Sequence, residues 1–105
     1  MIRAHIWLRR KDGMSVEDFQ RYWIETHAPI ARDGYARLTS YRIDLVTRVP
    51  QGQEAPYDGV AVLTWDDREA MKEDLGSEAG LRGAEDLASF TSANGFLFVE
   101  EHVVR

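Results

Sequence analysis

The sequence predicts an α+β domain of the ferredoxin-like type, in which a four-stranded antiparallel sheet carries helices on one face. The strand and helix patterns follow one another in the order βαββαβ, which is that of the split βαβ arrangement. The chain has 105 residues, the size of one ordinary domain. Hydrophobic residues make up 44% of it, enough to bury a core. We therefore expect residues 1–105 to form a single domain.

The first strand is expected near the N-terminus. Its aliphatic residues occupy alternate positions: Ile2, Ala4, Ile6 and Leu8. The positions between them are polar or aromatic, and this period of two is that of a strand with one buried face. Charged residues interrupt the same stretch, so we expect neither a signal sequence nor a membrane span there.

A helix is expected to follow, and Ser15 with Asp18 resembles a capping box at its start. The residues that recur at helical spacing after it are Phe19, Tyr22, Trp23, Thr26 and Ile30. Pro29 has no N–H to donate, and it disfavours helical geometry at the residue before it. We therefore predict that the helix ends or kinks directly after His27, which places His27 at a helix C-terminus.

Two more strands are predicted in the middle of the chain. Residues 38–46 contain β-branched and aromatic residues without Gly or Pro. Residues 60–65 are apolar on both faces, which is typical of a strand at the centre of a sheet. Residues 50–56 contain two prolines and a glycine, and we expect them to form the loop between these strands.

The remaining elements are two helices and a last strand. Asp66 with Glu69 predicts the start of a short helix that ends at Gly76. A second helix is expected to begin near Ser77. Its apolar stripe consists of Leu81, Ala84, Leu87 and Ala88. The last strand is predicted over residues 96–104.

The composition excludes several classes of function. The formal net charge is −5 and the basic residues are scattered among acidic ones, so nucleic acid and anionic membranes are not expected partners. The chain has no cysteine, which removes disulfides, thiolate nucleophiles and cysteine-bound metal sites. A small domain without disulfides is typical of the reducing cytoplasm, which is the location we expect.

The face of the sheet that lacks helices predicts a homodimer. It is expected to carry His5 and Trp7 together with one side of the apolar third and fourth strands. An exposed apolar face of this kind usually marks an interface, and pairing two such sheets closes a barrel through two-fold symmetry. The alternative is that these aromatic residues are scattered on the surface, as they are on most proteins.

The candidate reactive residue is His27, which lies four residues after Trp23. This spacing places both side chains on the inward stripe of the helix, where an imidazole must find a hydrogen-bond partner or stay neutral. A neutral, partly buried histidine can act as a base. The alternative is that His27 only caps the helix or bridges it to a strand.

The segment from Phe19 to Pro29, with its Tyr-Trp and His-Ala-Pro pairs, resembles the signature helix of the EthD family of dimeric α+β barrel proteins. Further positions that fit the family are Tyr57 to Val60, Trp65, Met71, Asp86 and Phe90. The resemblance implies a ferredoxin-like subunit that pairs into a barrel. It also implies that His27 is the acid/base residue. The short link over residues 32–37 departs from the family, in which a longer Pro/Gly-containing segment is common.

The other candidate site residues are aromatic or titratable side chains. Those expected to line the pocket are His5, Trp7, Tyr22, Trp23, Tyr41, Trp65, Phe98 and His102. The three histidines show no metal-ligand spacing, so no metal site is expected. No Gly-rich phosphate loop is present either, and we expect no cofactor.

Three functions are compatible with such a pocket. The first is cofactor-independent proton transfer on a small apolar or aromatic metabolite, giving isomerisation, cyclisation or dehydration with His27 as acid/base. The second is cofactor-free oxidoreductase chemistry of the monooxygenase type, in the manner of small monooxygenases that share such a barrel. The third is a non-catalytic role, as an accessory or ligand-binding protein of a catabolic or biosynthetic pathway.

Overall fold

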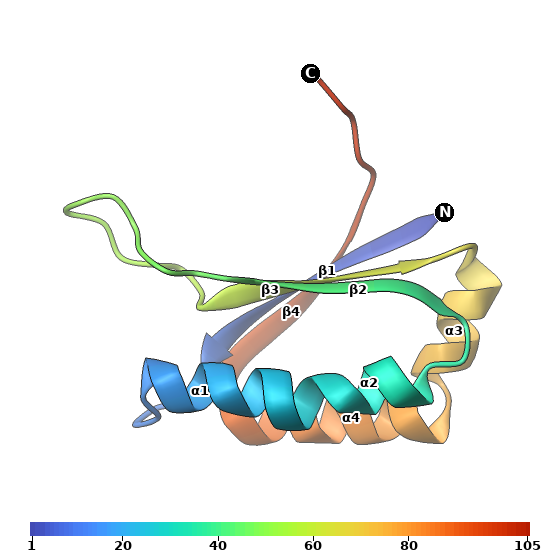
Figure 1. Cartoon of the computed structure of the whole chain (residues 1–105), viewed down its shortest axis with the longest axis horizontal. Helices are drawn as coiled ribbons and strands as arrows, with labels where there is room; N and C mark the ends of the chain where they lie inside the picture. The colour runs from blue at the N-terminus through green and yellow to red at the C-terminus, as the bar shows by residue number, and fades with distance from the viewer.

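The structure, a computed structural model of residues 1–105, is an antiparallel sheet with helices on one face (Figure 1). The strand order is β2-β3-β1-β4. The strands are β1 (Ile2–Arg10), β2 (Leu38–Leu45), β3 (Gly59–Trp65) and β4 (Thr91–Val99). The helical segments are α1 (Val16–Tyr22), the π-helical turn η1 (Trp23–His27), α2 (Ala28–Gly34), α3 (Arg68–Leu75) and α4 (Glu78–Phe90). The predicted ferredoxin-like α+β fold is confirmed.

The register of the sheet decides which strand residues face the helices. Ile6 lies opposite Ala61 of β3 and Phe96 of β4, so these three share the helix-facing side. Along β1 the even positions from Ala4 to Leu8 are buried there, as the alternation predicted. β3 lies between β1 and β2, and all but one of its residues are buried, which agrees with its apolar sequence.

The opposite face of the sheet has no helix over it (Figure 1). His5 lies there opposite Val62 and Leu97, and Trp7 lies opposite Val60 and Gly95. A Cβ on Gly95 would lie only 2.6 Å from Trp7 Cε2, so the glycine leaves the room that the indole occupies across β4. We call this surface the open face.

The long helical run differs from the prediction, because it does not end at His27. The cap is confirmed, since Ser15 Oγ accepts a hydrogen bond from the Asp18 N–H at 3.1 Å. The run then continues through Pro29 to Gly34. The Ala28 N–H donates to the Trp23 carbonyl, five residues back, which is the bonding of a π turn. This wider turn directly precedes Pro29, which lies in the first turn of α2, where its missing N–H is best tolerated.

The second helical region is close to its prediction but not identical. The cap of α3 is Asp67 and not Asp66, because the Asp67 side chain accepts from the Ala70 N–H at 2.8 Å. Ser77 caps α4 as expected. Leu81 was expected on the inward stripe but is 67% exposed. The other three residues of the predicted stripe, Ala84, Leu87 and Ala88, do line the interior, and Gly80 and Phe90 are buried on the same helix.

The last strand was predicted too far along the chain. β4 covers Thr91–Val99, and residues 100–105 lie outside the sheet and are exposed. The reason is its partner: Val99 pairs with Arg3, almost at the start of β1, so there is no strand beyond it to pair with. Figure 1 shows this tail leaving on the side of the open face. Residues 50–56 form a loop, as predicted.

Candidate functional site

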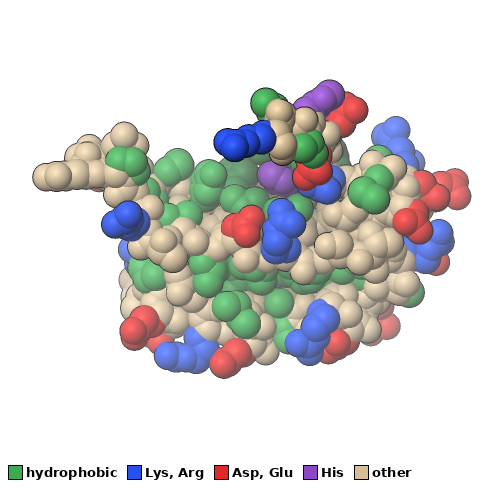
Figure 2. Space-filling model, turned by 45° about the horizontal axis from the view of Figure 1, so that its top comes forward, with side chains coloured by type: hydrophobic (Ala, Val, Ile, Leu, Met, Phe, Trp, Pro, Cys, Tyr) green, Lys and Arg blue, Asp and Glu red, His purple; other side chains and the backbone are tan.

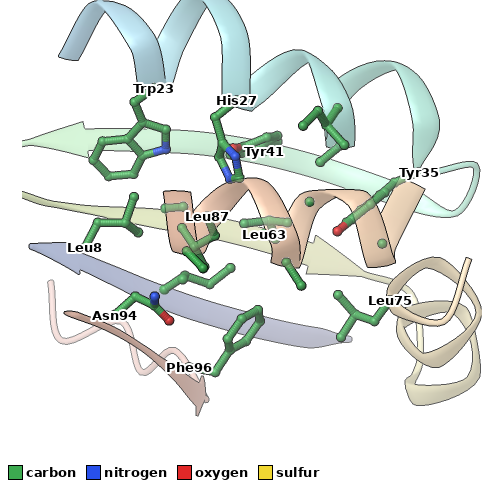
Figure 3. A pocket seen from close by; sticks show the side chains of 18 residues that line it. Leu8, Trp23, His27, Tyr35, Tyr41, Leu63, Leu75, Leu87, Asn94 and Phe96 are labelled. Carbon is green, nitrogen blue, oxygen red and sulfur yellow. The ribbon is translucent and has the colours of Figure 1, made fainter. Parts of the chain in front are cut away.

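A cavity of about 450 Å³ lies between the sheet and the helices (Figure 3). It is lined by 18 residues, 14 of them hydrophobic, so its walls are mainly apolar. Ile6, Leu8, Ala61 and Leu63 contribute from the central strands. Both the size and the lining are those of a small-molecule site.

His27 extends from the helical run into this cavity, near Tyr41 (Figure 3). Its Nδ1 lies 2.7 Å from Oδ2 of Asp86 on α4. The two side chains are 14% and 20% exposed, so the pair is largely shielded from water. The Phe90 ring packs against the imidazole with a centroid distance of 4.9 Å.

The contact with Asp86 fixes the form of the imidazole. An ionised carboxylate only accepts hydrogen bonds, so the proton of a neutral His27 lies on Nδ1. Nε2 then carries the lone pair, and it makes no hydrogen bond within the chain. In this neutral form, the arrangement presents an unprotonated ring nitrogen on the wall of an apolar cavity, with the imidazole oriented by a carboxylate.

Tyr22 completes the group, because its hydroxyl donates to the other Asp86 oxygen, Oδ1, at 2.6 Å. This hydrogen bond raises the pKa of Tyr22 above its usual value, because it favours the protonated phenol. Asp86 is thus held by donors on both oxygens. The carboxylate cannot turn away from His27 without breaking the bond to Tyr22.

The π turn explains how Tyr22 and His27 reach the same carboxylate. In a regular α-helix, residues five apart point about 140° away from each other. The wider turn over Trp23–His27 holds more residues per turn and brings the two side chains closer in direction. π turns of this kind are frequent at functional sites.

Two further tyrosines face the cavity, Tyr41 from β2 and Tyr35 at the end of α2. Burial raises the pKa of Tyr41 to about 12. Burial, together with the nearby Asp74, also raises the pKa of Tyr35. Both hydroxyls stay protonated near neutral pH and can donate to a ligand oxygen.

The structure brings together only part of the predicted set. His27, Trp23 and Tyr41 line the cavity, and Tyr22 lies behind it on Asp86. Trp65 is fully buried outside the lining, with its Nε1 donating to Asp74 at 2.8 Å.

The other predicted residues lie elsewhere. His5 and Trp7 are on the open face. Phe98 is 64% exposed on the edge strand β4 and does not line the cavity. His102 is in the exposed tail.

Sequence reasoning gave Asp86 no role at the site. It is 59 positions from His27, and no local spacing links the two. The sequence does contain one indication, because Asp86 lies four residues before Phe90. Residues four apart share one face of a helix, so Asp86 lies on the same inward face as the buried Phe90. Tyr35, Gly83 and Asn94 also line the cavity and were not singled out.

The structure shows neither a metal-binding cluster nor a membrane-spanning helix. No group of three or more His, Cys, Asp or Glu side chains is arranged to hold a metal ion. None of the helices combines the length and the hydropathy needed to cross a membrane.

The family model of the EthD domain matches residues 11–94, which is well over half of the chain. The chain belongs to the EthD family. The match includes the whole helical run with His27, and it includes Asp86 on α4. None of the curated proteins matches the chain.

Several solved structures superpose on nearly the full length of the chain. An ethyl tert-butyl ether D (EthD) family protein from Bacillus halodurans has a TM-score of 0.80 at 20% identity, covering 97% of this chain and 100% of that one. A dimeric ferredoxin-like protein of unknown function from Thermobifida fusca has a TM-score of 0.69 at 14% identity, with coverages of 93% and 88%. A dimeric protein with a ferredoxin-like fold from Bacteroides fragilis has a TM-score of 0.69 at 11% identity, with coverages of 95% and 95%. At these identities the likeness establishes the fold.

Proposed function

We propose that this EthD protein is a cofactor-independent enzyme that binds a small apolar or aromatic molecule in the cavity and moves a proton on it with His27. The observation that carries the proposal is the 2.7 Å contact between His27 Nδ1 and Asp86 at the wall of the cavity. It leaves Nε2 as a free base beside a bound ligand. A ligand in this space is surrounded mainly by hydrophobic side chains.

The chemistry that suits this arrangement is proton transfer next to a carbonyl. Nε2 takes a proton from the carbon beside the carbonyl, and the electron pair moves onto the carbonyl oxygen as an enolate. A tyrosine hydroxyl such as that of Tyr41 donates to that oxygen. The imidazolium is stabilised by Asp86 and returns the proton to a second carbon, which isomerises the ligand, or to a leaving hydroxyl, which dehydrates it.

The test uses a simple ketone, 2-tetralone, as a probe. Exchange of its α-protons with deuterium from the solvent is followed by NMR, and binding is measured by calorimetry. We expect the wild-type protein to accelerate exchange and His27→Gln to lose the acceleration while the affinity for the probe stays within about threefold. His102→Gln is the matched control, because His102 is exposed in the tail. Exchange that is equally fast with His27→Gln would exclude His27 as the base, and probe binding without exchange would indicate a ligand-binding protein.

We also propose that the protein works as a homodimer paired through the open faces of two copies. Three observations support this. The open face carries Trp7, Val62 and Leu97, and Leu97 is 55% exposed. Figure 2, which views this side obliquely, shows hydrophobic side chains interspersed with a histidine and some charged groups. The structures from Thermobifida fusca and Bacteroides fragilis are described as dimeric.

A further inference from the structure

Tyr35 lies at the end of the cavity opposite Trp23 (Figure 3). It is the first residue after α2, and its N–H donates to the Ala31 carbonyl at 3.0 Å. Its ring stacks against that of Trp65, with a centroid distance of 6.5 Å and an angle of 27° between the planes. Backbone and ring are therefore both held in place, and Figure 3 shows the hydroxyl directed toward the interior of the cavity.

The hydroxyl of Tyr35 is free to bind a ligand. Tyr22 donates to Asp86, but the Tyr35 hydroxyl makes no hydrogen bond within the chain. No fully buried side-chain nitrogen or oxygen lacks a partner, so an unpaired hydroxyl at this position is accessible from the cavity. A fixed, unpaired donor in an apolar space orients a bound molecule.

Gly83 on α4 faces this hydroxyl. A Cβ at position 83 would lie 3.4 Å from Tyr35 Oη and 3.8 Å from Ile30 Cγ2, which are ordinary contact distances. Alanine would therefore fit and would favour the helix more than glycine does. The fold does not require glycine here. What the glycine does provide is open space directly in front of the Tyr35 hydroxyl.

We propose that Tyr35 is a second anchor of the site, which binds a neutral oxygen of the ligand at the end of the cavity away from His27, and that Gly83 keeps the space for it open. The inference rests on the proposed function and adds a substrate class. The ligand is a neutral, mainly aromatic molecule with one oxygen near His27 and a second, a hydroxyl or carbonyl, at Tyr35.

The charges around this end favour a neutral oxygen over a carboxylate. No Lys or Arg is among the residues that line the cavity. Asp74 lies close enough to Tyr35 for its charge to contribute to the raised pKa of that phenol, so a second negative charge there would be repelled. A carboxylate at Tyr35 would be buried without a cation, which is strongly unfavourable.

The experiment compares three rigid two-ring probes by calorimetry: 2-naphthol, 2,6-dihydroxynaphthalene and 6-hydroxy-2-naphthoate. We expect wild-type protein to bind the dihydroxy probe about tenfold more tightly than 2-naphthol, and the carboxylate at least about tenfold more weakly than the dihydroxy probe. Tyr35→Phe should remove the preference for the dihydroxy probe and leave 2-naphthol binding unchanged. Tyr57→Phe is the control, because Tyr57 does not line the cavity and should keep the preference.

Gly83→Ala separates the loss of the anchor from a loss of folding. We expect it to remove the same preference while raising the melting temperature, because alanine favours the helix. The proposal is overturned if Tyr35→Phe retains the preference, or if the carboxylate binds as tightly as the dihydroxy probe. The outcome is independent of catalysis. If deuterium exchange depends on His27 but the preference for the dihydroxy probe does not depend on Tyr35, only the proposed anchor is wrong. If the preference depends on Tyr35 but exchange does not depend on His27, only the catalytic proposal is wrong.

Discussion

His27 and Asp86 are 59 positions apart in the sequence, yet Nδ1 of the imidazole lies 2.7 Å from Oδ2 of the carboxylate. The contact joins the π turn of the first helical run to α4, two helical elements on the same face of the sheet. It sets the tautomer of His27, and Tyr22 holds the carboxylate from its other oxygen. Packing of the two helical elements and the orientation of the His27 imidazole therefore depend on the same side chain.

Asp86→Asn should lower the rate of proton exchange far more than the affinity for the probe. An amide keeps the shape of the side chain but loses the charge, and its single oxygen can accept from His27 or from Tyr22 but not from both. Hydrogen bonds to charged groups contribute about 1.5–3 kcal/mol, which corresponds to about 10- to 100-fold in rate. The measurement is the exchange of 2-tetralone in saturating probe, with the affinity taken from calorimetry.

Glu85→Gln is the matched control for Asp86→Asn. It makes the same chemical change one position earlier on α4, at an exposed side chain. Its exchange rate should be that of the wild type. If Asp86→Asn also exchanged protons at the wild-type rate, Asp86 would have no role in orienting His27.

Most of the fold could be predicted because it depends on local patterns. The alternation in residues 2–8, the cap at Ser15 and the apolar third strand each have a direct counterpart in the structure. The end of β4 is not set by a local pattern of this kind. The charges of Glu100 and Glu101 gave a weak signal, but the strand stops at Val99 because its partner β1 begins there. Strand length is thus set by a distant segment.

The sequence indicated that His27 faces the cavity, but it did not reveal the contacts that hold this side chain. His27 was identified from the helix pattern and the EthD resemblance, and Trp23 and Tyr41 line the same cavity. Pro29 was expected to end or kink the helix, but the sequence does not reveal that a π turn lets it continue. Nor does it reveal that Asp86 is the partner, because that contact depends on how α4 packs.

The stability of the protein should decrease between about pH 10 and pH 12 through Tyr41, whose pKa burial raises from 10.0 to about 12. The unfolded chain loses this proton near pH 10, while the folded chain keeps it longer. The folded state therefore binds more protons in this window, and its stability falls as the pH rises. A shift of this size corresponds to about 3 kcal/mol across the window.

Urea unfolding at several pH values on either side of the window tests this. Tyr41→Phe cannot titrate there, so its free energy of unfolding should fall less steeply with pH than that of the wild type. Tyr57→Phe, which changes a tyrosine that does not line the cavity, should keep the wild-type slope. Parallel slopes for all three proteins would contradict the buried, protonated state of Tyr41.

Gly59→Ala should destabilise the protein and disturb the cavity. A Cβ at Gly59 would lie 2.5 Å from Cζ3 of Trp23 and 2.9 Å from the Asp44 carbonyl oxygen. Overpacking of this kind costs about 1–3 kcal/mol, and here it displaces an indole that lines the cavity. We expect a lower melting temperature and weaker 2-naphthol binding. Gly83→Ala is the contrasting variant, because Gly83 lies in α4 and the melting temperature should rise. A fall in the melting temperature of Gly83→Ala as well would show that a Cβ at position 83 is not accommodated.

If the protein pairs through its open faces as proposed, Leu97→Asp should make it a monomer. Leu97 lies on the open face opposite His5 and is 55% exposed in a single chain. If two open faces pack together, the substitution buries a carboxylate without a partner at the interface, which costs several kcal/mol. Light scattering after gel filtration measures the mass directly.

Leu81→Asp is the matched control, because Leu81 is 67% exposed on α4, on the other side of the sheet, and should leave the dimer intact. A Leu97→Asp protein that remains dimeric while Leu81→Asp becomes monomeric would place the interface on the helices and not on the open face.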